Sequence, residues 1–276
     1  MNEELVKEFE RDMIKKFRKD IWSKFTKAIK KYEMVQEGDR IAIAMSGGKD
    51  SLLLAKLFQE LKKHPLVNFE IEFISMDPGF SEENLKMHFE NAHKLGVPVN
   101  IAESNIFKIV EKISNDYPCY MCARMRRGFL YNMAQEKGCN KLALGHHFDD
   151  VIETTLMNML YSGNIGTMLP KVKSKNFQGV ELIRPMYMIK EEDIKLIMKR
   201  HDIVTMDCGC EITVCSTSSK RYATKQLIKQ LKLESPGVDK NIFRAAENVN
   251  LDNIYRYVEN GVEKIKYDEE YNKKDV

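Results

Sequence analysis

The hexapeptide "SGGKDS" (Ser46–Ser51) stands between an apolar run, "RIAIAM" (Arg40–Met45), and a run typical of a helix, "LLLAKLFQEL" (Leu52–Leu61). Its two glycines let backbone N–H groups approach an anion without a Cβ in the way. The helix that follows adds its N-terminal amides and the positive end of its dipole. The lysine supplies a mobile positive charge, and the serines supply hydroxyl donors. The hexapeptide therefore predicts a phosphate-binding turn between a strand and a helix.

The turn is not a Walker loop, because G-x-x-x-x-G-K-[ST] places its first glycine farther from the lysine than this turn does. A glycine pair alone is also compatible with a tight strand-to-helix connection that binds nothing. The lysine, the acid and the serines beside it favour phosphate binding. We predict that the nucleotide is contacted by Ser46, Gly47, Gly48, Lys49, Asp50 and Ser51. Lys49 and Asp50 are also expected to act in catalysis.

Further along the chain, strand patterns alternate with helix patterns. Strand patterns cover residues 69–76, 97–104 and 141–147, and amphipathic helix patterns cover 81–96 and 149–163. Such alternation predicts an α/β fold with a doubly wound parallel sheet. Ligands of these sheets bind outside the C-terminal strand ends. SGGKDS, "DPGF" after the second strand and "GHHFDD" before the later helix all fall at that edge, so we expect three motifs to meet in one crevice.

Three regions are expected: an N-terminal amphipathic helix over 1–36, the α/β domain over 37–200, and a C-terminal helical region over 201–276. Apolar residues of the first region recur every four positions. They are Leu5, Phe9, Met13, Phe17, Ile21, Phe25 and Ile29. This stripe is expected to pack on the main domain. Contact between the opposite, lysine-rich face and RNA is a secondary alternative.

The composition is that of a soluble globular protein. Of the 276 residues, 43% are hydrophobic, and no apolar run is long enough to cross a membrane. The first residues, "MNEELVKEFERDMIKKF", are charged throughout and contain no signal-peptide core, so we expect a cytoplasmic protein without a membrane partner. The net charge of +3 is too small to indicate nucleic acid by itself.

Six cysteines in a cytoplasmic protein argue against a disulfide framework. Cys119 and Cys122 form C-x-x-C, and Cys208 and Cys210 form C-x-C in the C-terminal region, with Cys215 close behind. This spacing is equally compatible with a zinc ribbon and with an iron–sulfur site, and less so with a persulfide-forming redox pair. The remaining cysteine stands alone and is expected to be a small core residue.

SGGKDS after a strand is the signature of the PP-loop ATP pyrophosphatases, and the chain resembles that superfamily in more than this motif. Four further segments resemble the branch of the tRNA 2-thiocytidine synthetases, namely "CYMCARMRRG" (119–128), "LALGHHFDDVIETTLMNMLYSG" (142–163), "MLPK" (168–171) and "IRPM" (183–186). The resemblance covers nearly the whole chain. It implies the PP-loop fold of the adenine nucleotide alpha hydrolases, with an N-terminal helix and a helical C-terminal extension.

The resemblance also implies an ATP-dependent tRNA sulfurtransferase. Such enzymes cleave ATP between the α and β phosphates, transfer AMP to a substrate oxygen and release pyrophosphate. Adenylation converts a pyrimidine carbonyl oxygen, expected at C2 of a cytidine, into a good leaving group that sulfur then replaces. The implied cofactors are ATP, Mg²⁺ and a [4Fe–4S] cluster. The implied partners are tRNA and a sulfur donor, such as a cysteine desulfurase or free sulfide; monomer and homodimer both stay open.

Acids and histidines of two motifs are the expected magnesium and nucleotide contacts. Mg²⁺ prefers one or two carboxylates plus phosphate oxygens, which suits Asp50 together with Asp149 or Asp150. One aspartate of that pair is expected to cap the helix that follows it. We assign catalysis to Asp150 and nucleotide contact to Asp149, Gly145 and His146. At least one of the two adjacent histidines is expected to be buried and hydrogen-bonded.

The resemblance implies that three cysteines hold the cluster. Cys119 and Cys122 match the family's C-x-x-C, whereas "DCGCEITVC" (207–215) departs from its P-C-x-x-C. The third ligand is therefore Cys210 or Cys208, and we favour Cys210. Three ligands leave one iron open, as a catalytic metal site keeps a vacant position. A site fully ligated by four thiols stays open as an alternative, in which a cysteine persulfide would carry the sulfur.

Two further assignments keep an alternative. Met76, at the end of the second strand, is expected to contact adenine or to be a core residue. Arg124, Arg126 and Arg127 follow the C-x-x-C at helical spacing. They are equally compatible with a local role, in ion pairs or in hydrogen bonds to helix ends, and with contacts to tRNA phosphates.

Two other classes of function are weighed against the sulfurtransferase. A PP-loop amidating ligase would replace the oxygen with ammonia, and it predicts no cysteine cluster. A zinc-stabilised RNA-binding protein that has lost ATP chemistry would not need Lys49, Asp50, Asp149 and Asp150, all of which are present. The sequence therefore favours the sulfurtransferase.

Overall fold

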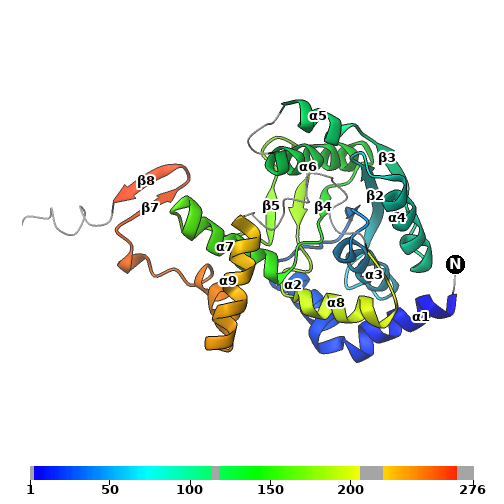
Figure 1. The fold of residues 1–276 in the computed structure, drawn as a ribbon, viewed down its shortest axis with the longest axis horizontal. Helices are drawn as coiled ribbons and strands as arrows, with labels where there is room; N and C mark the ends of the chain where they lie inside the picture. Colours follow the sequence, from blue (N-terminus) through cyan, green and yellow to red (C-terminus); the bar gives the residue numbers. More distant parts are fainter. Residues whose placement is uncertain (1–2, 114–117, 206–219, 266–276) are drawn as a thin grey trace, which may run out of the picture.

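A central sheet of six strands forms the core of the molecule (Figure 1). The computed structural model describes residues 3–113, 118–205 and 220–265. The strands are β1 (Asp39–Met45), β2 (Phe69–Asp77), β3 (Ile101–Glu103), β4 (Lys141–Ala143), β5 (Lys171–Lys173) and β6 (Glu181–Ile183). Their order is β3-β2-β1-β4-β6-β5, with β5 antiparallel to β6 and the other neighbouring pairs parallel. The order reverses between β1 and β4, and doubly wound sheets bind ligands at such a switch point.

Helices cover both faces of this sheet. They are α3 (Lys49–Lys63), α4 (Glu82–Lys94), α5 (Ile106–Ile113), α6 (Pro118–Glu136) and α8 (Glu191–Arg200). Side chains of β1 alternate between the two layers: Ile41, Ile43 and Met45 belong to the cluster with α3 and α8, whereas Ala42 and Ala44 pack toward α6. Burial on both faces is expected for parallel strands joined by helices. The predicted α/β doubly wound fold is confirmed (Figure 1).

The N-terminal segment is helical, as predicted, but it is not purely α-helical. Two π-helical stretches lie between two α-helices: α1 (Glu3–Arg11), η1 (Asp12–Lys16), η2 (Arg18–Trp22) and α2 (Ser23–Lys31). A strict four-residue repeat shifts by about 40° per step around an α-helix, and the wider i→i+5 turns of a π-helix offset that drift. Phe9, Met13, Ile21 and Phe25 therefore all stay buried in one core cluster.

A second helical group lies beside β5 (Figure 1). It consists of α7 (Phe148–Ser162), α9 (Lys220–Glu234) and α10 (Val238–Ala245), followed by the hairpin β7 (Arg256–Glu259) and β8 (Val262–Ile265). Phe148 and Ile152 of α7 pack with Ile228 of α9. Helix α7 belongs to the predicted 37–200 region but packs with α9 of the predicted 201–276 region. The domain boundaries therefore remain a prediction. No helix in the described part of the chain has the length and apolar character of a membrane span.

Candidate active site

The phosphate turn connects β1 to α3 at the C-terminal edge of the sheet. Gly47 has a φ of +80°, a conformation that residues with a Cβ rarely adopt. Gly48 is the N-cap of α3 and has no side chain to cap it, so the first amides of the helix are left for a ligand. Ser51 Oγ donates to the Gly48 carbonyl at 2.9 Å and lies 3.3 Å from Ser46 Oγ. The turn is thus braced from within while its amides suit an anion.

Gly145 brings the GHHFDD motif against this turn. A Cβ at this position would lie 3.1 Å from the Asp50 carbonyl carbon and 3.2 Å from the Ser51 nitrogen. A larger residue would therefore push the end of β4 away from α3. SGGKDS and GHHFDD meet as predicted, because β1 and β4 are adjacent and parallel. The third motif, DPGF, does not join them: Asp77 at the end of β2 accepts hydrogen bonds from the N–H groups of Gly79 and Phe80 in its own turn.

Lys49 is held between two carboxylates at the start of α3. Its Nζ lies 3.1 Å from Asp50 Oδ2 and 3.3 Å from Glu191 Oε1. Burial lowers the pKa of Lys49, but the two carboxylates outweigh burial and raise the pKa above its usual value. Glu191 also pairs with Lys225 at 2.7 Å and with Lys195 at 3.0 Å. Burial opposes its ionisation, yet the lysines hold the pKa of Glu191 well below its usual range.

The two adjacent aspartates have different structural roles. His147 and Asp150 form a capping box on α7, in which the Asp150 carboxylate accepts from the His147 N–H at 3.0 Å. Asp149 accepts from the Glu191 N–H at 2.7 Å and so caps α8. The N-cap of α7 is a histidine and not the expected aspartate, because the helix begins at Phe148, before both acids. His147 is also the buried, hydrogen-bonded histidine.

Separate variants of the two aspartates are expected to behave differently. Asp149→Ala should lower the free energy of unfolding by about 1 kcal/mol, because α8 loses its cap. It should spare turnover, because Asp149 does not line the cavity beside the phosphate turn and its predicted nucleotide contact is not supported there. Asp150→Asn keeps a hydrogen-bond acceptor for the His147 N–H, so it should reduce turnover at nearly unchanged stability. Denaturant unfolding and tRNA thiolation assays on both variants test this. Equal losses of stability with full activity in both would contradict it.

A cavity of 340 Å³ opens between the phosphate turn, the end of β4 and α6. Asp50, His146 and Asp150 line it on the sheet side, and Arg126 and Arg127 line it on the α6 side. Asp50 Oδ1 and His146 Nδ1 are buried and have no hydrogen-bond partner among the described residues. Buried unsatisfied polar atoms of this kind are typical of ion and ligand sites.

Asp50 and Asp150 fit a magnesium ion. Burial raises the pKa of Asp50; His147 and Lys49 oppose this rise, and the charge of Asp150 adds to it. A cation near both acids would offset the burial and the repulsion. In the described part of the chain, no three His, Cys, Asp or Glu side chains gather closely enough to hold a metal. Phosphate oxygens would therefore complete the coordination, in the manner that Mg²⁺ prefers.

His146 is neutral at physiological pH. Burial lowers the pKa of His146 to about 4; Asp150 opposes this, and the charges of Arg184, Arg221 and Arg127 add to it. A neutral imidazole offers one donor and one acceptor. His146 is therefore suited to hydrogen-bond a base or a ribose, and it carries no charge toward a phosphate.

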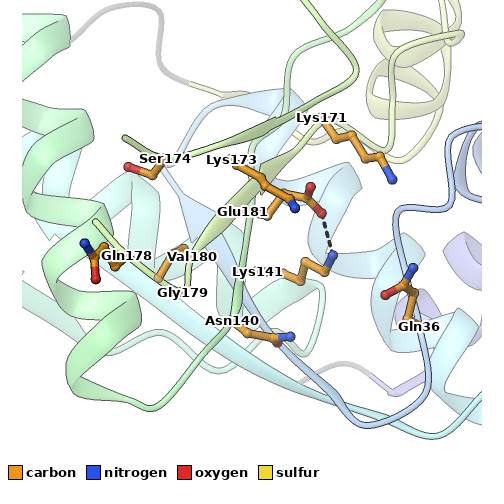
Figure 2. Close-up of a pocket in the computed structure, with 10 residues that line it drawn as sticks. All are labelled: Gln36, Asn140, Lys141, Lys171, Lys173, Ser174, Gln178, Gly179, Val180 and Glu181. Carbon is orange, nitrogen blue, oxygen red and sulfur yellow. Dashed lines mark hydrogen bonds and ion pairs between the residues drawn. The ribbon is translucent and has the colours of Figure 1, made fainter. Parts of the chain in front are cut away.

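A larger cavity, of 590 Å³, lies at the opposite edge of the sheet (Figure 2). Lys141 and Glu181 begin β4 and β6, and their side chains form an ion pair of 2.5 Å in its wall (Figure 2). Lys141 Nζ also lies 4.0 Å from Asp39 Oδ2, so carboxylates already compensate this buried cation. Ligands of doubly wound sheets bind at the other strand ends. We therefore place the active site in the smaller cavity.

The C-x-x-C motif opens helix α6. Cys119 is the second residue of the helix, and Cys122 packs in a cluster that includes Met76 from the end of β2. Met76 is only 3% exposed and does not line the cavity, which favours its core role over the adenine contact. The first turn of α6 thus lies near the end of β2, on the same edge of the sheet as the phosphate turn.

The second cysteine cluster, Cys208, Cys210 and Cys215, lies outside the described residues, so its part in a metal site stays a prediction. The lone cysteine, Cys139, is 4% exposed, as expected for a core residue. Burial raises the pKa of the Cys139 thiol, which makes it a poor nucleophile.

Three charged residues near the site were not predicted: Glu191, Arg184 and Arg221. Arg221, at the start of α9, lies 3.3 Å from Asp150 Oδ1. The "IRPM" segment was a signal for Arg184. Glu191 had no sequence signal, because "KEED" reads as an ordinary acidic first turn of a helix.

Glu153 makes the free energy of unfolding depend on pH. It is 5% exposed, and its Oε2 lies 3.8 Å from Arg221 Nε. Burial raises the pKa of Glu153 from 4.5 to about 7, and the charge of Arg221 offsets only part of this rise. A raised folded-state pKa stabilises the fold below the unfolded-state pKa, and that stabilisation is lost as pH rises through the folded-state pKa.

Glu153→Gln should therefore raise the free energy of unfolding by about 1–3 kcal/mol near pH 8 and change it little near pH 5. Denaturant unfolding at the two pH values measures the difference. A glutamine variant that is less stable than the parent near pH 8 would contradict the assignment.

Comparison with known proteins agrees with this geometry. A family model described as "PP-loop domain" matches residues 18–207. The chain is 38% identical over 226 residues to the tRNA-cytidine(32) 2-sulfurtransferase of Geotalea uraniireducens, covering 81% of this chain and 88% of that protein. It is 36% identical over 230 residues to the protein of the same name in Alcanivorax borkumensis, covering 81% and 78%.

A solved structure shares the fold. The U34-tRNA thiolase NcsA from Methanococcus maripaludis, solved with its [4Fe–4S] cluster, superposes with a TM-score of 0.66 and covers 92% of this chain and 82% of that chain, at 24% sequence identity. Since the family model spans more than half of the sequence and the relatives align over most of their own length, the chain belongs to the PP-loop family, in the tRNA thiolation branch that includes the tRNA-cytidine(32) 2-sulfurtransferases.

Proposed function

We propose that the protein uses ATP to adenylate the C2 carbonyl of a cytidine in tRNA and then replaces that oxygen with sulfur. One observation carries the proposal: a single cavity joins the phosphate turn, the GHHFDD motif and the arginine face of the helix that begins with C-x-x-C. The names of the relatives indicate cytidine as the base and tRNA as the substrate.

The phosphate turn binds the part of ATP that leaves. The free amides at the start of α3 and the Lys49 ammonium hold the β and γ phosphates. Asp50 and Asp150 would hold Mg²⁺, which would supply positive charge to the phosphates. The C2 oxygen of the base attacks the α phosphorus, the bond to the β-phosphate oxygen breaks, and pyrophosphate leaves. Lys49 and the amides stabilise the charge that gathers on the leaving phosphates.

Adenylation prepares the second step, because a carbonyl oxygen is a poor leaving group and AMP is a good one. A sulfur nucleophile adds to C2, the bond from C2 to oxygen breaks, and AMP departs with the bonding electrons. Asp50, Asp150 and His146 line the cavity in which both steps occur. Neutral His146 orients the base by a hydrogen bond, which needs no change in its protonation.

Helix α6 begins with two of the three expected ligands of a [4Fe–4S] cluster. Cys119 and Cys122 are three residues apart in this helix, a spacing that brings two positions to the same face. With Cys210 as the third ligand, the cluster would supply an open iron position for the sulfur. The sulfur itself comes from a donor such as a cysteine desulfurase or free sulfide.

Nucleoside mass spectrometry of tRNA from a deletion strain tests the function. We expect 2-thiocytidine to disappear and to return when the wild-type gene is supplied, but not when a Lys49→Ala variant is supplied. Unchanged 2-thiocytidine in the deletion strain would overturn the proposal. Loss of a different thiolated base would keep the chemistry and overturn the choice of cytidine.

A further inference from the structure

Two arginines of α6 face the active-site cavity, and neither is paired with an acid in the described part of the chain. Arg126 and Arg127 line the cavity, and within the described ranges neither forms an ion pair with a carboxylate. Local ion pairing was one of their two predicted roles, and the described residues do not provide it. Arg221 differs, because it pairs with both Asp150 and Glu153.

A third arginine adds to this charge from the sheet. Arg184 directly follows β6, which is parallel to β4, and the Leu144 N–H donates to the Ile183 carbonyl at 3.0 Å. Arg184 therefore stands beside the strand end that leads into Gly145 and His146. It is 8% exposed; one of its guanidinium nitrogens donates to the Leu169 carbonyl. Its Nε is buried with no hydrogen-bond partner among the described residues.

The charge of Arg127 acts on Arg184. Burial is the main reason that the pKa of Arg184 falls to about 10, the charge of Arg127 is the next, and the charge of Asp150 opposes this fall. A buried guanidinium that forms no ion pair among the described residues is costly unless an anion balances it. A phosphate suits the site, because its oxygens match the planar fork of a guanidinium.

The phosphates of ATP have a separate place. Asp50 and Ser51 of α3 and Arg126 and Arg127 of α6 line two different walls of the cavity, and Lys49 is the first residue of α3. A second anion on the arginine side would leave the space between the two walls for a base. RNA supplies such an anion, since each nucleotide carries a phosphodiester on the same backbone as its base.

We infer that Arg127 and Arg184 form a subsite for the phosphodiester next to the target nucleotide, and that this contact directs the target base toward the phosphate turn. The inference rests on the proposed function, because it takes tRNA as the substrate. It assigns Arg184, a residue from the sheet, to RNA recognition beside the α6 arginines.

Binding measurements on the full chain test the subsite. Dissociation constants for unmodified tRNA are measured at several salt concentrations. Dissociation constants for a non-hydrolysable ATP analogue are measured at a single salt concentration. The variants are Arg127→Gln and Arg184→Lys, the second of which keeps the charge but loses the fork. The control is Arg256→Gln, which removes one exposed arginine from the C-terminal hairpin, where it pairs with Glu263.

Arg127→Gln should weaken tRNA binding about tenfold and reduce the salt dependence by about one phosphate contact. Arg184→Lys should also weaken tRNA binding, whereas both variants should bind the ATP analogue within about twofold of wild type. The Arg256→Gln control should bind tRNA within about twofold. Because Arg127 is exposed on a helix, its variant keeps the test valid even if an Arg184 variant fails to fold.

Two results would overturn the inference alone, provided that the wild type thiolates tRNA. One is normal tRNA binding by Arg127→Gln, or a loss no greater than that of the control. The other is weaker binding of the ATP analogue with tRNA binding unchanged, which would assign the subsite to the triphosphate. A wild type that binds no tRNA would overturn the inference together with the proposed function.

Discussion

Replacing Lys49 with alanine is expected to abolish pyrophosphate release in the presence of ATP and tRNA, with at least a hundredfold loss of turnover. The ammonium stands at the first residue of α3, where charge gathers on the leaving phosphates. A preorganised charge in such a position contributes about 3 kcal/mol or more to the barrier. A pyrophosphate release assay with purified protein and tRNA measures the loss.

The fold should survive this change. Lys49 is only partly buried, and its partners Asp50 and Glu191 keep other charged neighbours, since Glu191 still pairs with Lys225. Lys195→Ala is a matched control, because Lys195 contacts the same Glu191 carboxylate from outside the cavity. Turnover of Lys49→Ala within tenfold of wild type would refute the assignment of the turn.

The second large effect concerns the proposed cluster. Changing Cys119, Cys122 or Cys210 singly to alanine should remove both the iron–sulfur absorbance and thiolation, because a cubane with too few thiolates is not retained. Binding of an ATP analogue should survive, since the phosphate turn is built from β1 and α3. Anaerobic purification, iron analysis and the absorption spectrum give the readout, with about four irons per wild-type chain.

Two controls locate the third ligand. Cys139→Ala should keep cluster and activity, because about 21–26 Å of helix α6 lie between the C-x-x-C and Glu136, the last residue of the helix before Cys139. Cys208→Ala decides between the candidates: if it keeps the cluster, the third ligand is Cys210, and if it alone loses the cluster while the Cys210 variant keeps it, the ligand is Cys208. Loss in both variants would mean four ligands and no open iron. A colourless wild type with stoichiometric zinc would contradict the cluster itself.

The sequence was sufficient to predict the sheet and the meeting of SGGKDS with GHHFDD at its edge. The apolar run before SGGKDS, with residues such as Ile43 and Ala44 on alternate faces, has no polar side for water and so had to be a buried strand. The parallel order then placed the ends of β1 and β4 together. The backbone at Gly145 lies so close to Asp50 that there is little room for a Cβ. The sequence did not predict this contact, because Gly145 is only one glycine in a motif.

Other features depended on packing that no local pattern records. Glu191 and Arg184 reach the site because α8 begins and β6 ends beside it, although both residues lie more than a hundred positions after the turn in the sequence. DPGF was expected in the crevice, but the Asp77 carboxylate accepts hydrogen bonds from the N–H groups of its own turn. The short strands β3, β4, β5 and β6 are too brief for a period of two to stand out.

Helix α6 is a single rod that carries both the cysteine pair and the arginines. Its apolar side, with Cys122, Met125 and Phe129, packs against Met76 and fixes the rotation of the rod about its axis. Successive residues of an α-helix turn by about 100°, so the angle about the helix axis between the C-x-x-C positions and the arginine positions is set by the count of residues between them. The proposed cluster and the proposed RNA contact would therefore keep a fixed rotational relation on this helix. A single residue inserted between the two motifs would leave both motifs unchanged in sequence. It would rotate one of them about the helix axis by about 100°, away from the cavity.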